Sequence, residues 1–124
     1  MTSAQFEEYL ESIGGLIDCG FSKERKPLVS RYFFGVDDGW LELLRDLIDD
    51  LMAAGWTKEI VQVKEKFAGL RFYALGLNKE CDKILSRYED LAAKTCEKCG
   101  KPGNLDQNGN WMHTFCEEHM RVAK

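Results

Sequence analysis

This sequence of 124 residues has no long apolar run, only two prolines and fewer basic than acidic residues. No apolar stretch approaches the length of about 20 residues that a membrane-spanning helix needs. The acidic segment from Met1 to Glu11 lacks the basic start and apolar centre of a signal peptide. We therefore expect a cytoplasmic protein without a membrane segment. The formal net charge of −4 disfavours a general polyanion binder, because such proteins usually carry a basic face.

Catalytic motifs are also scarce. The sequence has two histidines, no glycine-rich phosphate loop and no G-x-S-x-G nucleophile motif. We therefore expect a protein that binds rather than one that catalyses.

Helical periodicity is the first pattern that the sequence does contain. Apolar residues recur at spacings of three and four in a first segment from Thr2 to Ile17, although Gly14 and Gly15 weaken its end. The clearest helix runs from about Gly39 to Ala54, and a third runs from a cap at Asn78 to Ala92. Asp37 or Asp38 is the expected N-cap of the second helix, and Gly55 the residue just past its end.

Strand patterns lie between the second and third helices. Ile60–Lys64 and Leu70–Leu75 read as a β-hairpin, in whose turn Gly69 is expected to supply the unusual backbone angle. Leu28–Phe34 reads as a further extended segment. Together these elements predict an α+β fold of amphipathic helices packed on a β-hairpin or small antiparallel sheet. We expect residues 1–95 to form this core domain and residues 96–124 a zinc-binding module packed on it or continuous with it.

Two pairs of metal-ligating residue types lie near the C-terminus. Two residues separate Cys96 from Cys99 and Cys116 from His119, and sixteen lie between the pairs. Each pair can chelate from one tight turn, and the loop between them brings the pairs together around a tetrahedral ion. With five cysteines, an odd number, this pairing indicates metal binding in a reducing compartment rather than disulfides. Four protein ligands leave no open position, so we expect one structural Zn²⁺.

The segment around these ligands predicts a treble-clef or zinc-ribbon module. Asn108-Gly109 is a strong signal for a two-residue hairpin turn. A short helix from Cys116 towards Ala123 would turn Cys116 and His119 to the metal together. His113 is a competing ligand, but its spacing favours a place on the surface or beside the ligands.

Two charged surfaces are candidates for contact with a partner. One is the acidic outer side of the central helix, formed by Glu42, Asp46, Asp49 and Asp50. The other is the hairpin, where Phe67, Leu70 and Phe72 are expected to pack on the helices. Its solvent-facing cations and aromatic ring are Lys64, Lys66, Arg71 and Tyr73. Both sets also have a simpler interpretation as solvated sides of structural elements.

Three motifs occur together between about residues 37 and 119. They are Gly39-Trp40, the run Lys64-Glu65-Lys66-Phe67-x-Gly69-Leu70-Arg71-Phe72-Tyr73, and Cys96-Glu97-x-Cys99-Gly100-x-Pro102-Gly103 with Trp111, Cys116 and His119. Through them the chain resembles a family of small, largely uncharacterised proteins common in bacteriophages and prophages. The resemblance implies a phage setting and a zinc-binding end without naming a reaction. Ala68 stands where a second glycine is expected, and His119 where some relatives have cysteine.

These observations lead to three functional hypotheses. The first is a non-enzymatic phage or prophage accessory protein that binds a host protein or ribonucleoprotein complex and inhibits a bacterial defence system, as anti-CRISPR proteins do. The alternative is a nucleic-acid-binding protein that uses the zinc module with Lys64, Lys66 and Arg71. The third is a small metal-dependent nuclease that uses His113. The sequence predicts no oligomeric state.

Overall fold

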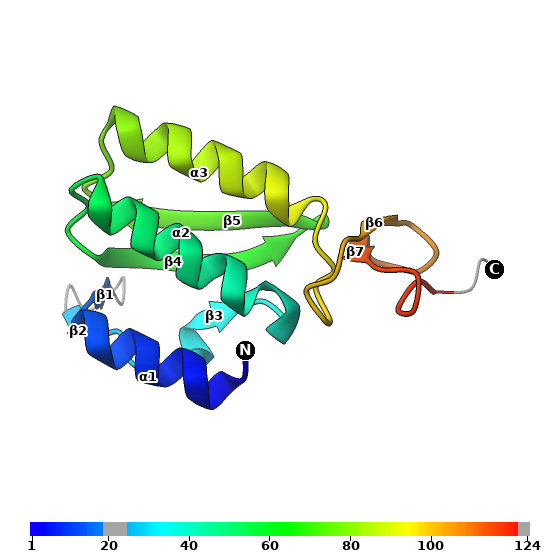
Figure 1. Cartoon of the computed structure of the whole chain (residues 1–124), viewed down its shortest axis with the longest axis horizontal. Helices are drawn as coiled ribbons and strands as arrows, with labels where there is room; N and C mark the ends of the chain where they lie inside the picture. Colours follow the sequence, from blue (N-terminus) through cyan, green and yellow to red (C-terminus); the bar gives the residue numbers. More distant parts are fainter. Residues whose placement is uncertain (19–24, 122–124) are drawn as a thin grey trace.

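The computed structural model describes residues 1–18 and 25–121 and confirms the α+β fold (Figure 1). Helix α2 crosses in front of the main sheet with α1 and α3 on either side of it, and the C-terminal hairpin projects from one end. The helices are α1 (Ser3–Ile13), α2 (Leu41–Ala53) and α3 (Lys79–Ala92). The strands of the main sheet are β1 (Leu16–Asp18), β2 (Arg25–Pro27), β3 (Phe34–Gly35), β4 (Glu59–Lys66) and β5 (Gly69–Leu75). The C-terminal hairpin consists of β6 (Asn104–Asp106) and β7 (His113–Phe115).

Helix α1 begins at a capping box and ends at a glycine. The Thr2 side chain accepts the Gln5 backbone N–H, and the Gln5 side chain accepts that of Thr2. Gly14 has a φ of +66°, a left-handed conformation that ends a helix. The prediction that this helix continues to Ile17 is wrong, because Leu16–Asp18 pair with other strands as β1.

Helix α2 confirms the clearest periodicity in the sequence. A one-turn 3-10 helix, Asp38–Trp40, leads into it, and Gly55 with a φ of +98° follows its end. The prediction that Asp37 or Asp38 caps α2 is wrong, because the N-cap of α2 is Trp40. Asp38 lies within the 3-10 helix, and Asp37 precedes it without a side-chain cap. The side chains that are fully buried on this face are Trp40, Leu41, Leu44, Leu47, Ile48 and Leu51.

Strand β4 is the centre of the main sheet. β5 pairs with it antiparallel from Glu59↔Leu75 to Lys66↔Gly69. β1 and then β3 pair with it in parallel, at Ile17↔Ile60 and Phe34↔Val63, and β2 pairs antiparallel with β1. The sheet is therefore mixed rather than antiparallel. Of the segment Leu28–Phe34, only Phe34 is in a strand, and Arg31–Phe33 form a 3-10 helix.

A β-bulge at Val61 determines which side chains of β4 face the helices. The register shifts between Ile60 and Gln62, so Val61 has no partner on β5. Beyond the bulge, Val63 is buried in the core, and Lys64 points to the opposite face because successive side chains alternate.

Phe67 and Ala68 form the two-residue turn between β4 and β5. Their φ values are 53° and 64°, and positive values at both positions are typical of a type I′ turn. The prediction that Gly69 carries the unusual angle is therefore wrong. The Glu65 side chain accepts the Ala68 N–H at 2.8 Å and stabilises the turn. Phe67, expected to pack on the helices, is instead 58% exposed at the turn.

Helix α3 begins as predicted at Asn78, whose side chain accepts the Cys81 N–H at 2.9 Å. Its buried side chains are Cys81, Ile84, Tyr88 and Ala92. They join α1, α2 and the inner face of the sheet in one hydrophobic core. Among the described residues, no helix combines the length and the apolar character needed to cross a membrane.

Candidate metal centre

The first pair of candidate ligands lies on a tight turn directly after α3. The Cys96 N–H donates to the Lys101 carbonyl at 2.7 Å, and the Gly100 N–H donates to the Cys96 carbonyl at 2.9 Å. Gly100 has a φ of +82°, which residues with a side chain rarely adopt. The turn therefore depends on this glycine to bring Cys96 and Cys99 together.

The second pair follows the C-terminal hairpin. β6 and β7 pair from Asn104↔Phe115 to Asp106↔His113, and Cys116 comes directly after β7. A turn then returns His119 to Cys116, with the His119 N–H donating to the Cys116 carbonyl at 3.1 Å.

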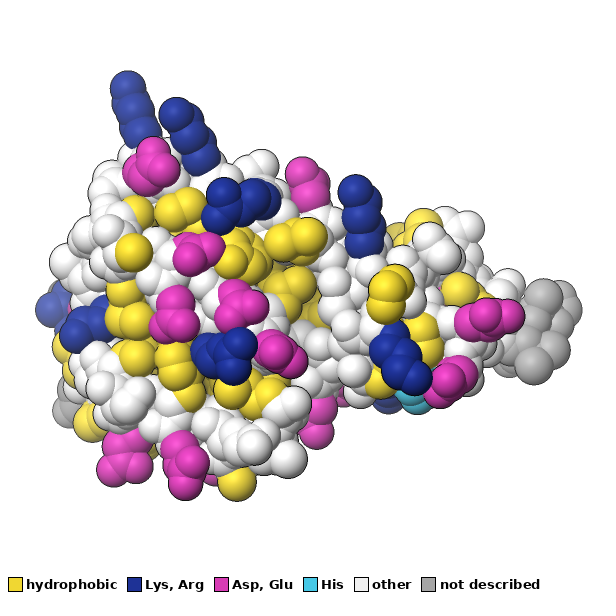
Figure 2. Space-filling model, in the orientation of Figure 1, with side chains coloured by type: hydrophobic (Ala, Val, Ile, Leu, Met, Phe, Trp, Pro, Cys, Tyr) yellow, Lys and Arg dark blue, Asp and Glu magenta, His cyan; other side chains and the backbone are white. Residues whose placement is uncertain are grey.

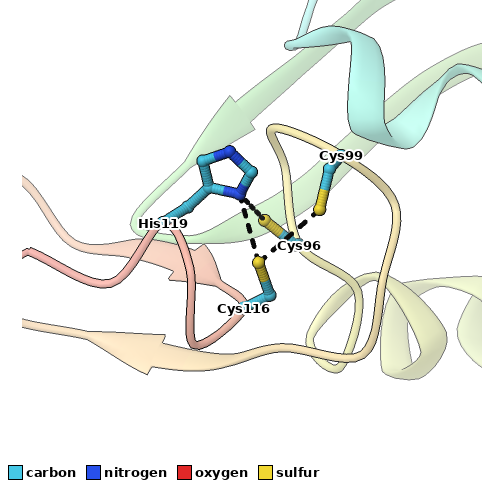
Figure 3. Close-up of side chains that lie close together, drawn as sticks. All are labelled: Cys96, Cys99, Cys116 and His119. Carbon is cyan, nitrogen blue, oxygen red and sulfur yellow. Dashed lines mark hydrogen bonds between the residues drawn. The ribbon is translucent and has the colours of Figure 1, made fainter.

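All four side chains converge on one point (Figure 3), and their ligand atoms lie within 4.8 Å of one another. The Cys99 and Cys116 sulfurs are 3.6 Å apart, as are the Cys96 sulfur and His119 Nδ1. The Cys116 sulfur and His119 Nδ1 are 3.1 Å apart. Zn–S bonds of about 2.3 Å and Zn–N bonds of about 2.0 Å place tetrahedral ligands roughly 3.5 to 3.8 Å apart. This Cys₃His group can hold one metal ion, and its donors are those typical of zinc.

Backbone amides favour the thiolate form of Cys96. Burial acts in the opposite direction, but the N–H groups of Cys116, Cys99 and Lys98 lower the pKa of Cys96 to about 7. At Cys99 the Lys101 N–H lowers the pKa, but desolvation and the neighbouring sulfurs outweigh it and the pKa is raised. Because a metal binds the thiolate, Cys96 is the sulfur best prepared for ligation.

His113 lies beside the Cys₃His group and is not part of it. Its Nδ1 is 3.1 Å from Oε1 of Glu97, and the other oxygen of Glu97 accepts the Thr114 N–H. Glu97 is only 2% exposed, and this burial raises its pKa although Thr114 and His113 act in the opposite direction. Nothing in the sequence distinguishes the buried Glu97 from the exposed acidic residues around it.

The hairpin between the two ligand pairs differs from its prediction. Asp106 pairs with His113, so six residues, 107–112, form the loop, and Asn108-Gly109 is not a two-residue turn. Asp106 holds this loop by accepting the Asn108 N–H at 2.8 Å and the Arg121 N–H at 2.8 Å. Burial opposes the charge of Asp106, but the hydrogen bonds from Arg121 and Asn108 lower its pKa to about 2.

The helix expected after Cys116 is not formed by residues 116–121, which make a turn. The rest of that prediction, towards Ala123, lies outside the described residues. The second ligand pair therefore lies on a turn after a hairpin, which is closer to a zinc ribbon than to a treble clef.

Gly39 and Trp40 contact the turn that carries Cys96 and Cys99, which we call the ligand turn. The Gly39 N–H donates to the Glu97 carbonyl at 2.8 Å, and the Trp40 indole N–H donates to the Thr95 carbonyl at 2.9 Å. A Cβ atom on Gly39 would lie 2.3 Å from the Cys96 carbonyl oxygen, so only glycine allows this approach. The Gly39-Trp40 motif thus packs the C-terminal module against the start of α2.

The predicted acidic residues lie along the outer side of α2, where two of them join helices. Asp49 accepts the Tyr9 hydroxyl of α1 at 2.6 Å, and Asp50 accepts the Tyr88 hydroxyl of α3 at 2.5 Å. Burial and the hydrogen bond to Asp50 raise the pKa of Tyr88 to about 12. These two carboxylates therefore link α2 to both neighbouring helices.

The other two acidic residues share one cation. Arg45 lies 3.0 Å from Asp46 and 3.6 Å from Glu42. Figure 2 shows the acidic side chains over α2 with basic side chains among them. All four of these carboxylates are thus engaged in hydrogen bonds or ion pairs within the chain.

The predicted basic residues lie on the face of the sheet away from the helices, which we call the open sheet face. It consists of Lys64, Lys66, Arg71 and Tyr73. Lys64 and Arg71 are directly opposite each other on β4 and β5. None of the three cations forms an ion pair with a described residue. Tyr73 is 49% exposed.

Comparison with protein families, with curated proteins and with solved structures finds no match to this chain. Of the resemblance to phage proteins, the structure supports only the metal-ligating pattern. The phage setting stays a prediction from the sequence.

Proposed function

We propose that this chain is a zinc-binding, non-enzymatic phage or prophage accessory protein that binds a host macromolecular complex through the open sheet face. In this proposal the partner presents a negatively charged surface and belongs to a bacterial defence system, which the chain inhibits. The phage setting and the defence target rest on the sequence resemblance alone.

The bound zinc is proposed to be structural. Cys96, Cys99, Cys116 and His119 fill all four positions of a tetrahedral ion, so no position is left for a substrate or a reactive water. The metal would instead fix the ligand turn and the β6–β7 hairpin, which contain little apolar core of their own.

The observation that carries the proposal is the difference in charge pairing between the two candidate surfaces. The acidic side chains of α2 are hydrogen-bonded or ion-paired within the chain. Lys64, Lys66 and Arg71 have no such partners among the described residues, and Arg71 Nε is buried without a hydrogen bond. Charges that the fold does not use are the ones available to another molecule.

The test is capture of a partner from host lysate by the zinc-loaded protein. We expect the variant carrying Lys64→Glu and Arg71→Glu to lose the captured complex, because it reverses two charges on the open sheet face. Glu42→Gln is the matched control, since it changes an exposed charge on α2 and should leave capture unchanged. Capture of no specific partner, or a loss confined to Glu42→Gln, would contradict the proposal.

Direct binding of single-stranded nucleic acid is a second candidate, and exposed aromatic rings favour it. Tyr73 lies on the open sheet face, and Phe67 and Trp111 are 58% and 70% exposed around a cavity of about 290 Å³ that Lys66 also lines. Aromatic rings beside cations are the usual surface for stacked bases.

This candidate makes a prediction that protein binding does not. Neutralising three phosphates of a single strand should give a slope of log affinity against log salt of about −2, and Arg71→Ala should reduce it by about 0.7. An oligonucleotide affinity that does not depend on salt would exclude this candidate.

A further inference from the structure

Three metal-ligating side chains meet at the junction between the core and the C-terminal module, separate from the Cys₃His group. They are Glu65 of β4, Glu97 of the ligand turn and His113 of β7. One ligand atom from each lies within 4.8 Å of the other two, although Glu65 and His113 are 48 positions apart in the sequence. Side chains from three separate elements therefore bring possible metal ligands to one place.

In each of the two carboxylates, one oxygen accepts a backbone N–H, and the other is available as a metal ligand. Glu97 accepts the Thr114 N–H with Oε2 and places Oε1 3.1 Å from His113 Nδ1. Glu65 accepts the Ala68 N–H with Oε2, and within the described residues its Oε1 accepts no hydrogen bond. Backbone hydrogen bonds of this kind fix the orientation of metal-ligating carboxylates.

The imidazole is fixed as well. The His113 ring stacks on Phe115 with centroids 5.1 Å apart and an angle of 18° between the planes. Ligand bonds of about 2.1 Å place neighbouring octahedral ligands roughly 3.0 Å apart, close to the separation of His113 Nδ1 and Glu97 Oε1.

Space for further ligands lies next to the three side chains. A cavity of about 240 Å³ is lined by Glu65, Glu97 and His113 together with Phe34 and Asp37. Asp37 is paired with Lys98 at 3.2 Å, so it is engaged elsewhere. An ion at this place would keep several coordination positions for water, whereas an ion in the Cys₃His group would keep none.

We propose that Glu65, Glu97 and His113 form a second metal site, which binds one divalent ion of the Mn²⁺ or Fe²⁺ class and leaves it open to solvent. Two carboxylate oxygens and one imidazole nitrogen are donors for such ions, whereas thiolates select softer ones. The site goes beyond the proposed function, which needs only the Cys₃His group. It depends on the first site for its shape, because Glu97 follows Cys96 directly and His113 is three residues before Cys116.

The experiment is a titration of the zinc-loaded protein with Mn²⁺, with free Mn²⁺ measured by electron paramagnetic resonance. Mn²⁺ is the probe because it does not displace zinc from three thiolates. We expect one Mn²⁺ per chain, with affinity at least tenfold weaker in Glu65→Gln and in His113→Gln. Glu118→Gln, which removes an exposed carboxylate in the same module, is the matched control and should bind as the wild type does.

Two readouts separate a metal site from an ion pair between His113 and Glu97. Bound Mn²⁺ should show a coupling to an imidazole nitrogen that is absent in His113→Gln. The Glu65→Gln amide oxygen can still accept the Ala68 N–H, and unchanged zinc content in each variant shows that the fold is retained. The proposal is overturned if the wild type takes up no more Mn²⁺ than Glu65→Gln, or if bound Mn²⁺ lacks the nitrogen coupling.

Discussion

The core and the C-terminal module differ in how many apolar side chains they bury. In the core, all three helices and the main sheet bury apolar side chains in one cluster. In the part of the module that the structure describes, residues 96–121, the buried cluster consists of Cys96, Phe115 and Cys116, and two of these are candidate metal ligands. Burial of apolar surface stabilises a chain in proportion to the area buried, so the module has little to replace a lost metal. The comparison leads us to expect that one short chain combines a fold that needs no ion with a module that depends on one.

Removing the metal should have the largest effect on the difference in stability between the core and the module. In Cys116→Ser, or after zinc chelation, we expect residues 96–121 to unfold while α2 and the main sheet remain folded. Structural zinc contributes about 10 kcal/mol or more to modules of this kind. Amide hydrogen exchange measured residue by residue checks the result.

Cys81→Ala is the matched control for that experiment, because Cys81 is a buried cysteine of the core outside the ligand set. It should keep one zinc per chain and a protected module. A module that stays protected in Cys116→Ser would show that packing alone holds it.

Gly39→Ala should separate docking of the module from metal binding. The new methyl group would lie 2.3 Å from the Cys96 carbonyl oxygen and 2.4 Å from that of Glu97. We expect a loss of about 3 kcal/mol in the free energy of unfolding, with one zinc still bound, because the ligands themselves are unchanged. Thermal unfolding and metal analysis of the same sample measure both quantities.

The control for the docking experiment is Gly35→Ala, whose added Cβ would lie 3.3 Å from the Lys64 Cβ and therefore needs only a small shift. Equal losses in the two variants would mean that the contact at Gly39 is not special.

Acidification should weaken the module and leave the core unchanged. The pKa of Cys96 is lowered to about 7, so its thiolate is available above that value and is lost as the pH falls through it. Each pH unit well below 7 should therefore weaken zinc affinity by about tenfold through Cys96 alone, or about 1.4 kcal/mol. Zinc titration against a competing chelator between pH 5 and 8 measures this, and a constant affinity across that range would contradict it.

The smallest expected effect lies in the core and has the opposite sign. Ala68 adopts a φ of 64°, which costs a residue with a side chain about 1 kcal/mol. Ala68→Gly should therefore stabilise the protein by roughly 0.5 kcal/mol, after the greater flexibility of the unfolded glycine is subtracted. Ala74→Gly, in the ordinary backbone of β5, should destabilise it instead, and chemical denaturation compares the two.

Periodicity and spacing predicted the parts of the molecule whose signals are local. The α2 stripe, the Asn78 cap and the two ligand pairs each depend on residues close together in the sequence. β1 was not predicted, and of β3 only Phe34 lay in a predicted extended segment. Strands of three and two residues carry no periodicity and form only by pairing with β4.

The candidate site shows the same limit. The four ligands were predicted together, but the roles of Gly39 and Glu97 were not. Gly39 matters because a carbonyl 58 residues later in the sequence approaches it, and Glu97 because three elements enclose it. Such roles arise only from tertiary contacts, which the spacing of residues does not encode.

The bulge makes Val61 a position at which β4 tolerates a change of length as well as of side chain. Its side chain is 40% exposed, so many substitutions there would leave the sheet unchanged. Loss of that one codon would make Ile60 and Gln62 neighbours in regular pairing with Ala74 and Tyr73, and every later residue of the strand would keep its face. Val63 would still face the core and Lys64 the open sheet face, so an in-frame deletion at this point should leave both surfaces of the sheet unchanged.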